Sequence, residues 1–137
     1  MDLNHPLNCL TFNVQRGARR LGRHLETALK PHGLTAAQFS SLALLGNLGE
    51  QTITQLATLL DTDRTTLTRN LAVLVKDGLI KLSPSKDQRI RAYTLTDAGR
   101  KRLNEALPAW SATQAGLVTQ LAVSDAETLL QTLNRLG

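Results

Sequence analysis

The sequence predicts a mainly α-helical domain with one short β-hairpin in its second half. At 137 residues the chain has the size of a single domain and can bury a hydrophobic core. Hydrophobic residues make up 42% of it but aromatic residues only 3%, and this composition, rich in Leu and Ala, favours helices over strands. Apolar residues recur every three or four positions over most of the chain, and only residues 79–95 change to an alternating pattern.

The first three helices are predicted from apolar spacing and from helix caps. Residues 8–30 follow helical spacing until Pro31 ends the segment, which indicates one long helix. Thr35 and Gln38 have capping-box spacing and precede a second helix, which ends at one of the two glycines at positions 46 and 49. A threonine and a glutamine at positions 52 and 55 repeat this spacing before a short third helix.

The stretch DTDRTTLTRNL, residues 61–71, combines helical spacing with an unusual polar face. We expect Asp61 to be the N-cap of a fourth helix over residues 62–77, which Gly78 ends in a left-handed conformation. The side opposite the apolar stripe holds Thr62, Thr65, Thr66 and Arg69. Each exposed threonine costs a helix about half a kcal/mol relative to alanine, so this face has a purpose other than helix stability.

The remaining chain predicts a hairpin and two more helices. LIKLS and RIRAYTL alternate in character around a polar PSKDQ tract, which indicates two strands with a charged tip. Thr96 is expected to cap a fifth helix that Pro108 bends. Ser124 and Glu127 have capping-box spacing at the start of a sixth helix.

Positive charge is concentrated in the middle of the chain. Lys and Arg outnumber Asp and Glu by 10 to 5 in residues 61–102 and by 5 to 3 in residues 1–60, whereas residues 103–137 hold 1 basic and 3 acidic side chains. Basic side chains that served only as solvated surface would be spread more evenly along the chain. This distribution predicts that one part of the fold binds a polyanion.

Several classes of protein are excluded by what the sequence lacks. A single cysteine forms no internal disulfide, and no Cys/His cluster has the spacing of metal ligands, so we expect no metal or cofactor. Neither a signal peptide nor an apolar run of about 20 residues is present, which predicts a cytoplasmic protein. No nucleophile is paired with a base and no Gly-rich phosphate loop occurs, so an enzyme is not expected.

Two short helices, a helix with a Thr/Arg face and a hairpin with an arginine-bearing tip together predict a winged helix-turn-helix. The major groove of DNA admits such a helix, small hydroxyl groups do not hold it away, and arginine pairs two acceptors on guanine. The polar face of residues 61–71 is therefore expected to enter the groove. A non-specific architectural DNA-binding protein is the alternative, because it would share the same basic middle.

Five segments in order resemble the MarR family of bacterial transcription regulators: LTAAQFSSLALL, TITQLATLL, DRTTLTRNLAVLVKDGLI, KDQRIRAYTLTDAGR and LPAW. The resemblance covers essentially the whole chain. It implies a homodimer in which residues 1–33 and 97–137 form the pairing helices and residues 34–96 form the DNA-binding lobe. It also implies a repressor that occupies a palindromic operator and is released by a small aromatic or anionic effector.

The resemblance also assigns the DNA-binding residues. Thr65, Thr66 and Arg69 are expected to contact the groove, and Arg89, oriented by Asp87, to reach the minor groove. The complete set of expected DNA-binding residues is Arg64, Thr65, Thr66, Thr68, Arg69, Lys86, Asp87, Arg89 and Arg91. Lys86 and Arg91 are assigned to the DNA backbone. For Arg64 an ion pair with Asp61 or Asp63 is the alternative.

An effector site is expected near Trp110, because the resemblance implies an aromatic pocket between the first, second and fifth helices. Trp110 and Leu107 could equally be core residues. Arg16 and Arg20 belong to a run of four arginines on the first helix, and they either bind an anionic effector or form a solvated face.

Cys9 raises a second regulatory hypothesis, since one branch of the family senses organic peroxide through a cysteine near the start of the first helix. That branch also places tyrosines around the thiolate. Here the only tyrosine, Tyr93, falls in the predicted wing. We therefore expect Cys9 to be a buried, inert thiol, with a peroxide-sensing repressor as the alternative. His5 and Cys9 are four residues apart, but two ligands do not complete a zinc site.

Overall fold

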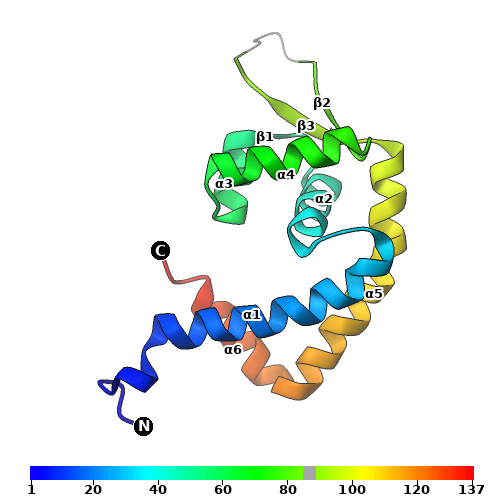
Figure 1. The fold of residues 1–137 in the computed structure, drawn as a ribbon. Helices are drawn as coiled ribbons and strands as arrows, with labels where there is room; N and C mark the ends of the chain where they lie inside the picture. The colour runs from blue at the N-terminus through cyan, green and yellow to red at the C-terminus, as the bar shows by residue number, and fades with distance from the viewer. Residues whose placement is uncertain (85–88) are drawn as a thin grey trace.

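Figure 1 shows the computed structural model, which describes residues 1–84 and 89–137. These residues form six α-helices, three short strands and two 3₁₀ turns. In chain order the elements are η1 (Pro6–Asn8), α1 (Leu10–Leu29), η2 (Lys30–His32), α2 (Ala36–Leu48), β1 (Gln51–Thr52), α3 (Ile53–Leu60), α4 (Arg64–Lys76), β2 (Ile80–Leu82), β3 (Ala92–Leu95), α5 (Asp97–Leu121) and α6 (Val123–Leu133). The mainly α-helical prediction is confirmed.

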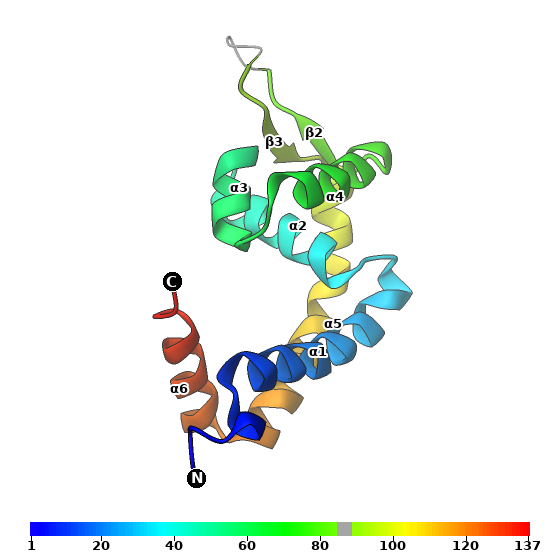
Figure 2. The same ribbon diagram turned by 60° about the vertical axis from the view of Figure 1, so that its left-hand side comes forward.

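The elements gather at two ends of an elongated molecule. The sheet lies with α2, α3 and α4 at one end, α1 and α6 lie at the other, and α5 runs between the two (Figures 1 and 2). Pro108 lies inside α5, and the helix bends along its length in Figure 1. The proline ring removes one backbone hydrogen bond and clashes with the preceding turn, so a bend is its expected effect. Within the two described ranges, no helix has both the length and the apolar character to cross a bilayer.

The hydrophobic core is centred on α2 and α4. Leu42 and Leu45 of α2 pack with Leu71 and Leu74 of α4, and all four are at most 1% exposed. Burial of one such side chain is worth about 1.5–3 kcal/mol. Leu29 at the end of α1 joins the same core, which anchors that helix. In contrast, α6 has no buried residue.

The sheet is antiparallel with strand order β1-β3-β2. The predicted hairpin is present, and Ile80 lies opposite Leu95 in it. The structure adds a third strand, because Gln51 lies opposite Tyr93 on the other edge of β3. A strand of two residues shows no alternation in sequence, so only the pairing reveals it. Tyr93 is thereby buried in the sheet, at 4% exposure.

Three of the predicted helix caps are confirmed. The backbone N–H of Gln38 donates to the hydroxyl oxygen of Thr35 at 3.1 Å, and the Thr35 N–H donates to the Gln38 side chain at 3.0 Å. The same reciprocal pair begins α3. At α5, the Gly99 N–H donates to the hydroxyl oxygen of Thr96 at 3.0 Å. These contacts are local, so their sequence spacing is sufficient to predict them.

The wing and α5 are joined closely to the end of α4. Gly78 has the predicted left-handed conformation, with φ +71°. The Thr96 hydroxyl donates to the Gly78 carbonyl oxygen at 2.6 Å. A methyl group on Gly99 would overlap the carbonyl oxygen of Leu79, so only glycine permits this approach. The direction of the wing relative to α4 therefore depends on this junction.

Two predicted caps are wrong. Asp61 is not the N-cap of α4 but the left-handed C-cap of α3, with φ 46°, and Asp63 caps α4 instead. The turn between the helices uses the intervening residues, since the Thr62 N–H donates to the Ala57 carbonyl oxygen at 3.1 Å. Ser124 forms no capping box, because α6 already begins at the residue before it.

Candidate nucleic-acid interface

The first turn of α4 is stabilised by the carboxylate of Asp63. This group accepts the Thr66 backbone N–H at 2.8 Å and the Thr66 hydroxyl at 2.9 Å. Hydrogen bonds from the backbone and then the side chain of Thr66 lower the pKa of Asp63 below its usual range. The Thr68 hydroxyl likewise donates to the carbonyl oxygen of Arg64, at 2.6 Å. The hydroxyl hydrogens of Thr66 and Thr68 are therefore already used, and each hydroxyl oxygen can only accept a hydrogen bond from another partner.

All five predicted residues of the recognition helix are exposed. They extend along one and a half turns of α4, from Arg64 at its first position to Arg69. Thr62, which was expected on the same face, lies before the helix and is half-buried in the turn. Among the described residues, Arg64 forms no ion pair with Asp61 or Asp63, so that alternative is wrong.

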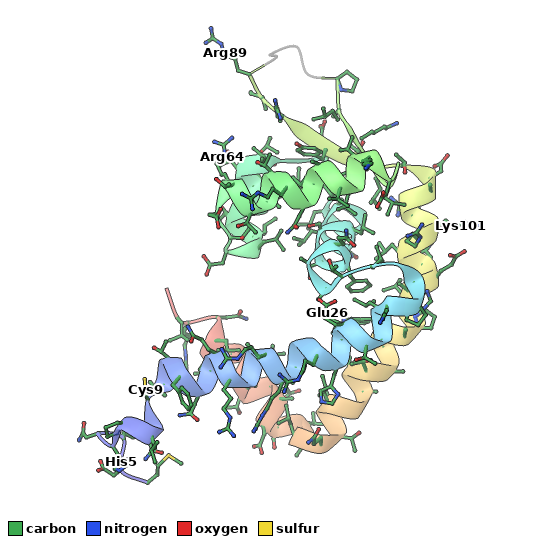
Figure 3. All side chains as sticks on the ribbon, in the orientation of Figure 1. His5, Cys9, Glu26, Arg64, Arg89 and Lys101 are labelled. Atoms are coloured by element: carbon green, nitrogen blue, oxygen red, sulfur yellow. The ribbon has the colours of Figure 1, made fainter. Side chains whose placement is uncertain are left out.

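The wing places two of its predicted residues on the same side of the molecule as α4. Arg89 and Arg91 are exposed. In Figure 3 the Arg89 side chain extends from the wing above the start of α4, where Arg64 lies. Lys86 and Asp87, the other two wing residues, lie outside the described residues.

A cavity of about 400 Å³ joins the wing, α3 and α4. Its lining includes three arginines, namely Arg64, Arg89 and Arg91. Thr52, Ile53, Thr54 and Ile90 complete the lining. The start of α3 was not among the predicted DNA-binding residues. Its capping box does locate the helix N-terminus in the sequence, but the nearness to Arg91 arises from pairing of β1 with β3.

Trp110 lies in a second, apolar cavity of about 610 Å³ between α2, the end of α3 and α5. Its ring stacks on Phe39, with 6.2 Å between ring centroids and 23° between planes. Leu107 and Trp110 are 38% and 37% exposed, so the alternative of simple core residues is wrong. Arg16 and Arg20 line neither this cavity nor the smaller one that Trp110 shares with α1. The structure therefore does not bring the predicted effector residues together.

Cys9 is exposed, as the residue that immediately precedes α1, so the expectation of a buried thiol is wrong. Among the described residues, no three His, Cys, Asp or Glu side chains are grouped so that they could hold a metal ion.

An exposed Thr/Arg helix next to an arginine-bearing wing defines a winged-helix DNA-binding protein. Solved structures of such proteins resemble it along nearly their whole length. MosR of M. tuberculosis in complex with DNA is 36% identical, with 93% of this chain and 99% of that chain covered and a TM-score of 0.78. A mutant of E. coli MarR in complex with operator DNA is 25% identical, with 99% of each chain covered and a TM-score of 0.86.

The family follows from these relatives and from a sequence match. The model of the MarR family matches residues 34–90, which span α2 to the wing. The curated HTH-type transcriptional regulator MhqR of Bacillus subtilis is 25% identical over 130 residues, which cover 90% of this chain and 86% of that protein. The chain belongs to the MarR family of DNA-binding transcriptional regulators, which are not enzymes.

Proposed function

We propose that the protein is a homodimeric, sequence-specific repressor that binds a pseudo-palindromic operator and is released by a small apolar effector. The observation that carries the DNA-binding part is the exposed face of α4, with Arg69 beside hydroxyl groups and with arginines of the wing on the same side. The relatives solved with DNA support it. The transcriptional repressor CouR, solved with a bound DNA duplex, supports the direction of regulation, since it is 27% identical over 98% of this chain.

Pairing of two chains through α1 and α6 is supported by their exposed apolar residues. Leu10 at the start of α1 is 75% exposed, and Leu136 after α6 is 66% exposed. Other exposed apolar residues of these two helices are Phe12, Val14, Val123, Leu129, Leu130 and Leu133, and Leu3 and Leu7 are exposed in the segment before α1. Soluble monomers rarely expose so much contiguous apolar surface. We therefore assign residues 1–33 and 97–137 to dimerisation and residues 34–96 to DNA binding.

The cavity beside Trp110 is the proposed effector site. The Phe39–Trp110 stack offers flat aromatic surface, and the polar groups in the lining come from Ser40 and Asn47. No charged side chain of the described residues lines it, so an aromatic ligand fits better than an anionic one. A ligand there would lie between α3 of the DNA-binding lobe and α5, and it would shift their relative position.

Two experiments test this proposal. Footprinting on duplexes selected by the protein from a random library, with random competitor DNA, should show a protected pseudo-palindrome; equal affinity for all sequences would instead indicate an architectural DNA-binding protein. Neutral aromatic compounds should quench the fluorescence of Trp110, the single tryptophan, and weaken DNA binding together. Ala43→Leu should narrow the cavity and weaken both effects while DNA affinity is retained.

The exposure of Cys9 favours peroxide sensing as a second candidate. Against it, Tyr93 is buried in the sheet and cannot serve the thiolate, as tyrosines do in the peroxide-sensing branch. We retain the effector-released repressor as the proposed function.

A further inference from the structure

The chain passes from the dimerisation helices into the DNA-binding lobe just before α2, and two side chains bind the backbone on either side of this crossing. Glu26 of α1 binds the first residue of α2, and Arg102 of α5 binds the last residue of η2. We propose that Glu26 and Arg102 are positioning residues that fix the angle of the lobe and thereby set the separation of the two α4 helices in a dimer. The inference rests on the proposed function, because only a dimer on an operator uses that separation.

Glu26 makes a capping contact with α2 from outside that helix. One of its carboxylate oxygens accepts the Ala36 N–H at 2.9 Å, and in Figure 3 its side chain lies between α1 and α2. Ala36 is the first residue of α2, so its N–H has no partner within the helix. Within residues 1–84 and 89–137 Glu26 forms no ion pair, and the partial positive charge of the helix N-terminus attracts its carboxylate.

Arg102 binds the other side of the crossing. Its Nη1 donates to the carbonyl oxygen of His32 at 3.3 Å, across 70 positions of the chain. The next residue, Gly33, has φ +67°, and a methyl carbon there would lie 3.3 Å from the same Nη1. Glycine therefore permits both the left-handed turn and the close approach of the guanidinium group. The end of η2 is thus bound to α5 as well as being continuous with α1.

These contacts decide the angle of the lobe because its other end is already fixed. There the Thr96 hydroxyl donates to the Gly78 carbonyl oxygen at 2.6 Å. A body held at one point can still rotate. Apolar packing opposes such rotation weakly because it has no preferred direction, whereas a hydrogen bond has one. In Figures 1 and 2 α2 lies between α1 and α4, so a small rotation at the start of α2 is enlarged at α4.

The first test measures how strictly the protein selects the spacing of the half-sites. One base pair added or removed between the half-sites of a selected duplex shifts one half-site by about 3.4 Å and rotates it by about 35°. The wild type should bind the altered duplexes much more weakly. Glu26→Ala should lower the ratio of affinities for unaltered and altered spacing by about fivefold, the equilibrium factor of one such hydrogen bond. Arg102→Met, which keeps the apolar stem, should act in the same direction.

Two control variants separate positioning from stability. Glu26→Gln keeps an oxygen that accepts the Ala36 N–H, so it should retain the wild-type ratio. Thr35→Ala removes the cap that α2 receives from its own N-terminal residue, so it should lower the Tm while the ratio stays unchanged. A wild-type ratio in Glu26→Ala overturns the inference. An equal decrease in Thr35→Ala also overturns it, because Glu26 would then act only as a stabilising cap.

The second test measures the separation of the two α4 helices without DNA. Lys76 is the exposed last residue of α4, so Lys76→Cys in a Cys9→Ser background places one spin label on each subunit. Pulsed electron paramagnetic resonance should give one narrow distance between subunits, and Glu26→Ala should broaden it; an unchanged width overturns the inference. If the parent protein gives no distance between subunits and sediments as a monomer, the proposed function fails and the inference fails with it. Failure of the inference alone leaves the dimer and its operator binding intact.

Discussion

Replacement of Arg69 by alanine should reduce specificity much more than it reduces stability. The side chain is exposed in the middle of α4 and forms no hydrogen bond or ion pair with another described residue. Its removal should therefore change the free energy of unfolding by less than about 0.5 kcal/mol. Thermal unfolding followed by circular dichroism checks this first requirement.

The loss of DNA affinity can be worked out from the proposed two-fold symmetry. A lost groove contact costs about 1–3 kcal/mol per half-site, so a dimer on two half-sites loses about 2–6 kcal/mol. The affinity for the selected duplex should therefore fall by a factor between about 30 and about 10⁴. Random DNA, which offers no matching base, should lose far less.

Fluorescence anisotropy with selected and random duplexes at the same salt concentration measures the ratio of the two affinities. Arg69→Ala should lower this ratio. Arg89→Ala should instead weaken binding to both duplexes together, most strongly where the flanks are A·T-rich. An unchanged ratio in Arg69→Ala would refute the assignment of this face to base recognition. Wild-type affinity of Arg89→Ala in low and moderate salt would show that the wing does not contact DNA.

Three further predictions concern assembly, regulation and pH. Sedimentation should show a dimer at micromolar concentration, and deletion of residues 124–137 should give an aggregating or unfolded chain; a folded monomer would contradict this. The protein should still bind DNA after treatment with mild peroxide. If peroxide released the DNA and Cys9→Ser abolished that release, the redox alternative would be established. Because the pKa of Asp63 is lowered in the folded state, its stabilising effect is present at neutral pH and is lost as pH falls through that pKa. The destabilisation caused by Asp63→Ala, measured by thermal unfolding, should therefore disappear in acid, and a pH-independent difference would argue against the charged cap.

The helices could be predicted where their signals are local. The threonines that begin α2, α3 and α5 bind groups within three residues, so spacing alone identifies them. The choice between Asp61 and Asp63 could not be made this way. Both acids have suitable spacing, and the chain reversal at the end of α3 decides that Asp61 takes the left-handed conformation and Asp63 caps α4.

The residue types of the proposed DNA-binding face could be read from the sequence, but their arrangement in space could not. The polar face of α4 is visible in the sequence because helical periodicity depends only on nearest turns. Which arginines share a cavity depends on the pairing of β1 with β3, which connects residues about forty positions apart. Cys9 and Trp110 show the same limit, since their exposure depends on which distant segments cover them.

The sequence by itself thus determined the helices, most of their caps, the basic character of the middle of the chain and the family resemblance, because each depends on neighbouring residues or on composition. Only the tertiary structure decided that Arg64 and Arg91 line one cavity with the first turn of α3, and that Arg16 and Arg20 do not line the cavity beside Trp110. These features arise where elements pack against each other, and the free energy of that packing comes from contacts between residues far apart in the chain.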